Sequence, residues 1–189
     1  DSHPQYQSNI IGSQLATNWN AKLVSIQHHK AHFASVLGEH NLFESEEKIL
    51  GVVWDGTGFG EDNSIWGGEF FSYHKNEMER LTHFEYVDWI AADKMAKEPR
   101  LSLLSVLPET DRHIAKGKFS ESEWKIYNKM LEKNSLKTSS VGRLFDAVAS
   151  LLLNIDSTSY EGEAAMLLEN EASNYQDESY INFLSGNAY

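Results

Sequence analysis

The chain has 189 residues, which predicts about one domain and is long enough to bury a hydrophobic core. Its 41% hydrophobic and 12% aromatic residues are typical of a folded globular protein. The net charge of −12 disfavours a nucleic-acid partner, the absence of cysteine excludes disulfides and a cysteine nucleophile, and no apolar run approaches the ~18 residues of a membrane span. We therefore expect a cytoplasmic protein with neither nucleic acid nor membrane as a partner.

The first half of the chain is expected to form two helices and a β-hairpin. Helices are predicted over residues 9–17 and 27–37, the second ending at Gly38, with a short strand over 23–26 between them. Apolar and β-branched residues predict a buried strand over 49–54, and a second strand over 65–73 returns beside it. The glycine-rich segment 55–62 is then expected to form the long turn of this hairpin.

The second half is predicted to be mostly helical, because helix-starting signals recur along it. Residues 174–189 are expected to form a loop or the start of a missing element. Strands followed by helices predict a mixed α/β layer architecture. In chain order the helix-starting signals are Pro99, the pair Ser120 and Glu123, Ser139 or Ser140, and the pair Thr158 and Glu161.

Two histidines have the spacing of metal ligands. His28 and His32 lie four residues apart in the predicted helix, which places both imidazoles on one helix face. The zinc-protease motif requires a glutamate directly after the first histidine, where this chain has His29. Histidines at this spacing are also common as surface or packing residues. As a metal site the pair needs a third ligand, expected to be a carboxylate from elsewhere in the chain.

The glycine-rich segment has features of a phosphate-binding loop. Asp55 ends the predicted strand, and Gly56, Gly58 and Gly60 alternate behind it. Glycines permit positive φ and let backbone N–H groups approach an anion, and Thr57 adds a hydroxyl donor. Asp55 is placed to hold a cation or a water that faces the same phosphate. The segment lacks the Lys-Ser/Thr pair of a P-loop, and many glycine-rich turns bind nothing.

A strand, a glycine- and threonine-rich hairpin and a returning strand resemble the ATP-binding fold of actin, Hsp70 and sugar kinases. Six segments in order make the resemblance more specific: DSHPQY at 1–6, QHHKAH at 27–32, DGTGFG at 55–60, IWGGEF at 65–70, SVGRLFDA at 140–147 and YEGEAA at 160–165. Together they are similar to the C-terminal region of the HypF family of hydrogenase maturation carbamoyltransferases. The similarity extends from Asp1 to about Glu171.

The resemblance implies a partial carbamoyltransferase domain over residues 1–189, truncated at both ends, with an actin-like mixed sheet and flanking helices. In this family an upstream YrdC-like domain makes carbamoyladenylate from carbamoyl phosphate and ATP. The domain seen here resembles the threonylcarbamoyl transferases of tRNA modification and is expected to pass the carbamoyl group to the C-terminal cysteine of HypE. The expected partners are HypE and the YrdC-like, zinc-finger and acylphosphatase domains of the full-length chain. By itself the chain is not expected to catalyse the full reaction.

The resemblance also assigns roles to individual residues. It implies that His28, His32 and Asp55 are catalytic and bind a divalent metal, which is iron or zinc, or magnesium with the nucleotide. It implies a supporting or structural role for His29. The ligand is expected to be ATP or carbamoyladenylate. The implied nucleotide-binding residues are Asp55, Gly56, Thr57, Gly58, Asp146, Glu161, Gly162 and Glu163.

Several residues keep more than one interpretation. Asp146 is expected either to bind the nucleoside ribose or to be a solvent-facing helix residue paired with Arg143. Arg143 and Arg100 are candidates for binding phosphate or the carbamoyl oxygen, because arginine offers a bidentate fork, although surface ion pairs are its commoner role. The Gly-Gly-Asp of the family reads Ala-Ala-Asp at residues 91–93 here, which removes glycines that a close backbone approach to ligand would need.

Two alternative functions stay open at this point. One is an O-carbamoyl- or threonylcarbamoyl-transferase that acts on a natural product or tRNA, although the net charge of −12 argues against tRNA. The other is a non-catalytic scaffold domain of the same fold. Binding of metal and nucleotide would distinguish an enzyme from a scaffold.

Overall fold

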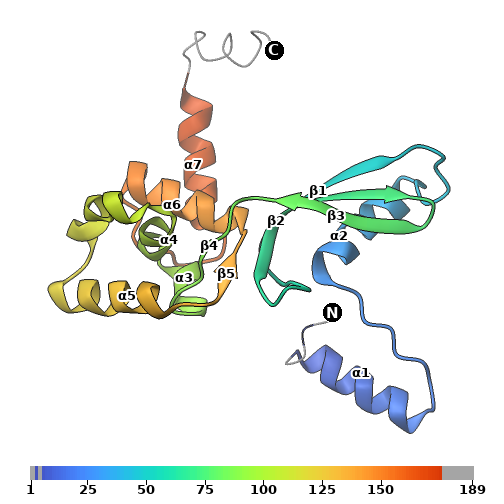
Figure 1. Cartoon of the computed structure of the whole chain (residues 1–189). Helices are drawn as coiled ribbons and strands as arrows, with labels where there is room; N and C mark the ends of the chain where they lie inside the picture. The colour runs from blue at the N-terminus through green and yellow to red at the C-terminus, as the bar shows by residue number, and fades with distance from the viewer. Residues whose placement is uncertain (1–2, 4–5, 176–189) are drawn as a thin grey trace.

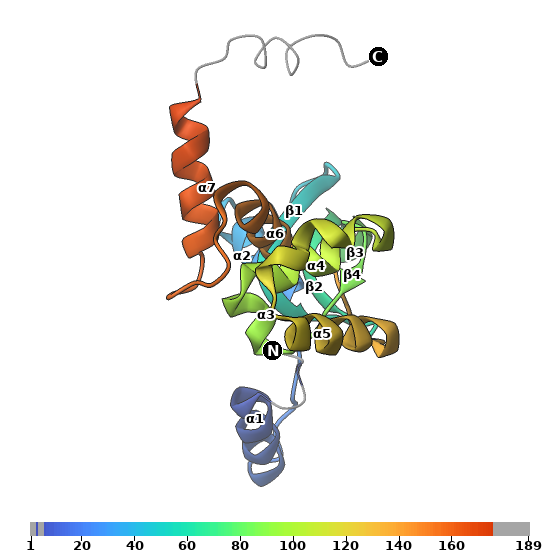
Figure 2. The ribbon, with the colours of Figure 1, turned by 90° about the vertical axis from the view of Figure 1, so that its left-hand side faces the viewer.

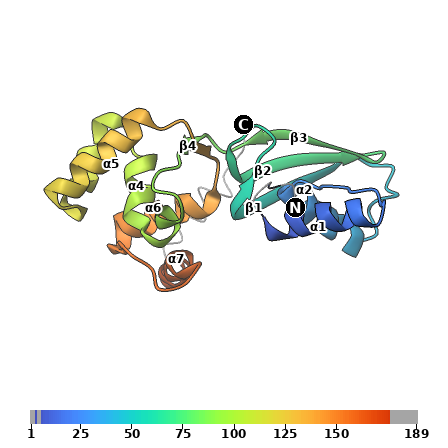
Figure 3. The same cartoon turned by 90° about the horizontal axis from the view of Figure 1, so that it is seen from below.

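A curled mixed sheet and a cluster of helices form the two parts of the chain in a computed structural model (Figure 1), which describes residue 3 and residues 6–175. Seen from below, the strands within residues 49–83 lie on one side and the helices within residues 93–174 on the other (Figure 3). Most of the predicted segment 174–189 lies outside the described residues. None of the described helices has the length and apolar character that a membrane crossing requires.

The sheet is built on a long antiparallel hairpin. Strand β1 (Ile49–Phe59) pairs with β2 (Ile65–His74), which also pairs with the antiparallel β3 (Glu77–His83). The short β5 (Lys137–Thr138) lies parallel to the start of β2, and β4 (Val87–Asp88) lies antiparallel to β5. The order along the main path is β1-β2-β5-β4, so β5 and β4 continue the sheet toward the helices.

Strand β1 contains a bulge where the sequence predicts a turn. Trp54 pairs with Gly68 and Gly58 pairs with Trp66, so three residues of β1 (55–57) lie opposite one residue of β2. The expectation that residues 55–62 form the hairpin turn is therefore wrong for their first part. The strand runs on to Phe59, and the chain reverses only at residues 60–64, where Gly60 N donates to Ser64 O. A bulge lets the ladder continue while it redirects the residues inside it.

The N-terminal helices are predicted correctly, but the strand between them is not. Helix α1 (Gln7–Asn18) and helix α2 (His28–Glu39) form where helices are expected at 9–17 and 27–37. Helix α2 runs one residue past Gly38. Residues 23–26 form no strand, because no described strand lies beside them to complete their hydrogen bonds. Helix α1 buries none of its residues and lies apart from the rest of the structure (Figure 2).

The helical part begins after β4. It contains α3 (Asp93–Lys97), α4 (Pro99–Val106), the 3-10 helix η1 (Glu109–Lys118), α5 (Glu121–Lys133), α6 (Val141–Leu153) and α7 (Glu163–Asn174). The capping box of Ser120 and Glu123 is confirmed at α5, and Ser140 caps α6. The expected start of the last helix at Thr158 is wrong. Thr158 instead donates its backbone N–H to Lys97 O, and α7 begins after Gly162, whose φ is 82°.

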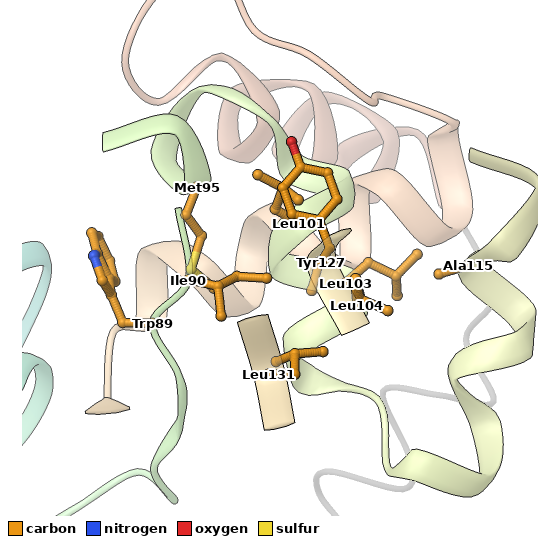
Figure 4. Packing of buried hydrophobic residues seen from close by; sticks show 10 residues of the cluster. Trp89, Ile90, Met95, Leu101, Leu103, Leu104, Ala115, Tyr127 and Leu131 are labelled. Atoms are coloured by element: carbon orange, nitrogen blue, oxygen red, sulfur yellow. The ribbon is translucent and has the colours of Figure 1, made fainter. Parts of the chain in front are cut away.

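Two hydrophobic clusters stabilise the two parts. The larger cluster lies among the helices, where leucines of α4 pack against residues of α5 and η1 (Figure 4). The smaller lies between α2 and the sheet and includes Phe33, Leu37, Trp66 and Phe71. Burial of a leucine or phenylalanine side chain stabilises the fold by roughly 1.5–3 kcal/mol. The sheet and the helices thus have separate cores, and the chain between β2 and α6 connects them.

Candidate functional site

Two histidines and an aspartate meet where α2 lies on β1. His28 Nε2 is 2.9 Å from Asp55 Oδ2 and 3.1 Å from His32 Nε2, and His32 Nε2 is 3.7 Å from the same carboxylate oxygen. These three donor atoms all lie within 4.8 Å of one another. The side chains of His28 and Asp55 are partly buried, whereas that of His32 is half exposed. The structure thus brings together the three residues that the sequence predicts as metal ligands.

Local hydrogen bonds fix the position of these three side chains. Gly56 N donates to Asp55 Oδ1 at 2.6 Å, which leaves Oδ2 to face the histidines. Gln27 caps α2 by accepting a hydrogen bond from Lys30 N, and its amide nitrogen donates to Phe59 O in β1 at 2.9 Å. A buried N-cap side chain that also bonds to the strand sets where α2 begins and how it faces β1.

His29 lies behind the three residues, with no exposed surface. Gln27 Nε2 lies 3.2 Å from His29 Nδ1, and His29 Nε2 is 3.8 Å from Asp55 Oδ2. Because the Gln27 amide nitrogen also donates to Phe59 O, the nitrogen facing His29 is a donor, and Nδ1 accepts. Burial lowers the pKa of His29 to about 4, so the ring is neutral at pH 7 with its proton on Nε2, toward Asp55. This position agrees with the supporting role expected for His29.

A cavity of about 450 Å³ lies on the other side of the bulge, between the sheet and the helices. This volume is within the roughly 300–1,000 Å³ of small-molecule sites. Three of the residues predicted to bind nucleotide line it, namely Gly56, Thr57 and Glu161. The other lining residues are Trp89, Asp93, Ala96, Lys97, Arg143, Thr158, Ser159 and Tyr160.

The sequence and the fold of the chain are similar to those of known proteins. Residues 51–188 match the family model described as the carbamoyltransferase Kae1-like domain, second subdomain, and residues 1–39 match the model of the HypF Kae1-like domain. The chain belongs to the HypF carbamoyltransferase family. The predicted α/β fold with a mixed sheet and flanking helices is confirmed by this match and by the structural neighbours.

Relatives in the HypF family resemble almost the whole chain. The chain is 36% identical to the carbamoyltransferase HypF2 of Cupriavidus necator over 94% of its length, and 36% identical to a probable carbamoyltransferase HypF of Methanocaldococcus jannaschii over 96%. A full-length HypF structure in its phosphate- and nucleotide-bound form superposes with a TM-score of 0.77 at 32% identity, covering 89% of this chain. The chain spans only 22–24% of the length of these proteins.

The donor atoms in this HypF-family chain fit a divalent cation such as zinc or iron. Four ligands about 2.0–2.1 Å from a tetrahedral zinc ion lie roughly 3.3 Å from one another. The separations among His28, His32 and Asp55 are 2.9, 3.1 and 3.7 Å, close to that value. Imidazole and carboxylate are ligands of zinc and of iron, and three protein ligands leave a coordination position open.

Four other residues predicted to bind nucleotide do not line the cavity. Gly58 is buried against α2 and Asp146 against Arg143, and neither is among the lining residues. Gly162 and Glu163 form the start of α7, where Glu163 accepts hydrogen bonds from the backbone and hydroxyl of Ser159, a lining residue. Their roles in nucleotide binding stay predictions.

Sequence reasoning missed part of the cavity wall. Trp89, Asp93 and Lys97 come from the segment that joins β4 to α4, which carries no periodic pattern and no motif. The one available signal was the Ala-Ala-Asp sequence at residues 91–93, because the family pattern at these positions places a loop near the ligand. Trp89, Asp93 and Lys97 reach the cavity wall because β4 pairs with β5 far along the chain, and local sequence does not reveal that pairing.

The glycines in and after the bulge do not have the backbone angles that the sequence predicts. Gly162 is the only described glycine with positive φ, so the expectation that Gly56, Gly58 and Gly60 supply such angles is wrong. A Cβ at Gly58 would lie 2.4 Å from His29 Cε1, and a Cβ at Gly60 would lie 2.1 Å from Trp66 Nε1. Gly58 is needed because α2 packs directly on the backbone of β1, and Gly60 is needed because the indole of Trp66 packs on the backbone just after β1.

Proposed function

We propose that this chain supplies the metal- and nucleotide-binding part of a HypF-type carbamoyltransferase. The donor is carbamoyladenylate, made from carbamoyl phosphate and ATP, and the acceptor is the C-terminal cysteine of HypE during [NiFe]-hydrogenase maturation. The observation that carries this proposal is the convergence of His28, His32 and Asp55 beside a cavity of about 450 Å³. The family, and a relative whose structure holds phosphate and nucleotide, support the choice of ligand.

The reaction is an acyl transfer. The thiolate sulfur of HypE attacks the carbamoyl carbon, a C–S bond forms, the bond from that carbon to the phosphate oxygen breaks, and AMP leaves with the electron pair. The chain has no cysteine, which agrees with a nucleophile that comes from another protein. A cation held by His28, His32 and Asp55 would supply Lewis-acid stabilisation of the charge that develops on the leaving phosphate.

The residues of the chain orient the site in this proposal. Asp55 begins the bulge whose next two residues, Gly56 and Thr57, line the cavity, so the metal ligand and the cavity wall share one backbone segment. Gln27 fixes the start of α2 against β1, and His29 lies behind Asp55, and neither residue lines the cavity. The YrdC-like, zinc-finger and acylphosphatase domains of full-length HypF proteins would supply the adenylate.

Metal analysis tests this proposal. We expect the purified chain, loaded with Zn²⁺ or Fe²⁺ and dialysed, to retain one ion, measured by plasma mass spectrometry. Replacing one of two histidine ligands or the carboxylate should lower metal affinity at least tenfold, because two ligands remain where three were present. The variants are His28→Ala, His32→Ala and Asp55→Asn.

His113→Ala is the matched control, because His113 belongs to η1 and its ring contacts Thr110 O rather than Asp55. It should retain metal like the unaltered chain. Equal metal retention in all of these variants would contradict the metal site. A chain that binds neither metal nor AMP by isothermal titration would favour the scaffold function instead.

A further inference from the structure

Arg143 is a buried cation with unused hydrogen-bond donors. It lies in the first turn of α6, is 7% exposed, and lines the cavity. Its Nε is 2.9 Å from Asp146 Oδ2, but the two are not aligned as a hydrogen bond. Within the described residues neither Nε nor Nη1 has a hydrogen-bond partner. A guanidinium group carries five N–H donors, and buried donors normally find acceptors.

The other arginine predicted to bind phosphate differs in this respect. Arg100 donates to Glu98 from Nε and Nη2, to Glu123 from Nη2 at 2.8 Å, and to Lys118 O from Nη1 at 2.7 Å. It does not line the cavity. The donors of Arg100 are therefore used within the fold, whereas those of Arg143 are available to a molecule in the cavity.

The charges around Arg143 are incompletely balanced. Burial lowers the pKa of Arg143 and raises the pKa of its partner Asp146 to about 6. Both shifts have the direction that desolvation gives, so the attraction between the two groups does not offset their burial. Glu161 adds a favourable charge from the cavity wall, but no hydrogen bond. An anionic oxygen in the cavity would satisfy the free donors and stabilise the charged guanidinium.

The start of α6, which carries Arg143, lies directly against the bulge of β1. Ser140, the N-cap of α6, donates its hydroxyl to Gly56 O at 2.6 Å, which ties the start of the helix to the bulge. A Cβ at Gly142 would lie 3.1 Å from Gly56 Cα, so the helix backbone lies close against this segment. The positive end of the 13-residue helix α6 and the Arg143 guanidinium are thus on the same side of the cavity.

We propose that Arg143 binds the phosphate group of the adenylate and thereby selects a phosphorylated nucleoside over the free nucleoside. The ligand chemistry is a phosphate ester with a purine nucleoside, held by charge-assisted hydrogen bonds from the guanidinium fork. This inference rests on the proposed function, because it assumes that the nucleotide occupies this cavity. The phosphate that Arg143 binds is the part of AMP that is bonded to the carbamoyl carbon. Arg143 therefore touches the substrate beside the C–O bond that breaks.

Isothermal titration of the chain with AMP and with adenosine tests the inference. Arg143→Gln should weaken AMP binding by at least tenfold and change adenosine binding by less than twofold. Arg143→Lys should fall between, because an ammonium keeps the charge but not the planar fork. The double variant R143Q/D146N removes both members of the ion pair, leaves no unpaired buried charge, and should show the same selective loss of AMP.

Arg100→Gln is the matched control. It removes an arginine with more internal hydrogen bonds, so it should lower the melting temperature while the ratio of AMP to adenosine affinity stays unchanged. Should Arg143→Gln not fold, the double variant and Arg143→Lys decide the outcome.

Two results would overturn the inference alone: folded Arg143 variants that bind AMP as tightly as the unaltered chain, or variants that lose AMP and adenosine equally. If the unaltered chain binds neither ligand, the nucleotide site of the proposed function fails, and the role of Arg143 fails with it.

Discussion

Asp146 illustrates how strongly position in the fold changes the chemistry of one residue. The sequence offered two interpretations, a ribose ligand or a solvent-facing partner of Arg143. In the structure Asp146 does pair with Arg143, but it does not face solvent, because it is only 6% exposed. Burial raises the pKa of Asp146 from 3.8 to about 6, and the nearby guanidinium only partly opposes this effect. The residue is thus poorly stabilised as a carboxylate at neutral pH.

This pKa predicts how stability depends on pH. The folded pKa of Asp146 lies above the unfolded value, so its carboxylate destabilises the fold above pH 6 and this cost disappears as the pH falls toward 3.8. Between pH 7 and 5 the free energy of unfolding of the unaltered chain should rise by about 1 kcal/mol relative to that of Asp146→Asn. Urea denaturation at the two pH values measures the difference. Glu171→Gln removes an exposed carboxylate of α7 and keeps Asp146, so as the control it should show the same rise as the unaltered chain.

At this scale the sequence predicts the histidine pair but not the complete site. His28 and His32 face the same way because the pitch of one helix fixes them, and the helix itself is evident from local pattern. That Asp55 completes the group depends on the contact of α2 with β1, which sequence spacing cannot supply. The difference between Arg100 and Arg143 is likewise invisible in the sequence, since it depends on which acceptors the fold brings to each.

Among the elements, the segment before α3 has the most strained backbone. Ala91 has φ 58°, and Ala92 has φ 49° with ψ −132°. The angles of Ala92 suit glycine rather than a residue with a Cβ, and such strain costs on the order of 1–3 kcal/mol. The family pattern of Gly-Gly-Asp has a direct explanation here: the turn into α3 keeps the conformation that glycines favour although this chain has alanines.

Restoring one glycine should therefore stabilise the protein. We expect Ala92→Gly to raise the free energy of unfolding by about 1 kcal/mol, after allowance for the greater entropy of glycine in the unfolded chain. For a chain of this size that is a rise of roughly 2–4 °C in melting temperature. Ala34→Gly in the middle of α2 is the control and should have the opposite effect, since glycine costs about 1 kcal/mol in a helix. A lower melting temperature for Ala92→Gly would contradict the strain.

Element boundaries were predicted where side chains signal them locally. Ser120 and Glu123 identify the start of α5 because the two residues cap the helix themselves. Residues 23–26 have a strand-like composition, but a strand needs a neighbour to complete its hydrogen bonds, and composition says nothing of that neighbour. The glycines at 56, 58 and 60 suggest a turn because glycine is common in turns, whereas in the structure Gly58 makes room for α2 and Gly60 makes room for Trp66.

Over the whole molecule, Glu69 joins the sheet to the helical part. It is fully buried in β2 and accepts hydrogen bonds from Gly67 N, Gly68 N and Ser139 Oγ with one oxygen. The other oxygen accepts from Arg80 Nε at 2.6 Å. Ser139 directly precedes the residue that caps α6 and binds the bulge. The Glu69 carboxylate therefore links β2 and β3 to the segment that begins α6.

Glu69→Gln should destabilise both parts together. The amide nitrogen would face a donor on one side or the other, and breaking a buried charge pair costs about 3–5 kcal/mol. We expect a single cooperative unfolding transition at a lower denaturant concentration than in the unaltered chain. Circular dichroism and tryptophan fluorescence should both report this same transition. The exposed Glu79→Gln on β3 is the control and should change the midpoint little. Unchanged stability in Glu69→Gln would show that the two cores hold together without this carboxylate.

The bulge of β1 has a consequence for how the chain tolerates insertions and deletions. Residues of a strand alternate between faces, so gaining or losing one residue at 55–57 would turn Gly58 and Phe59, the last residues of β1, to the opposite face. Asp55 or Thr57 would then leave its place, and two binding regions would be damaged by one change in length. The turn at Lys75 and Asn76, at the other end of β2, has no such dependence. A peptide tag or fluorescent label belongs there.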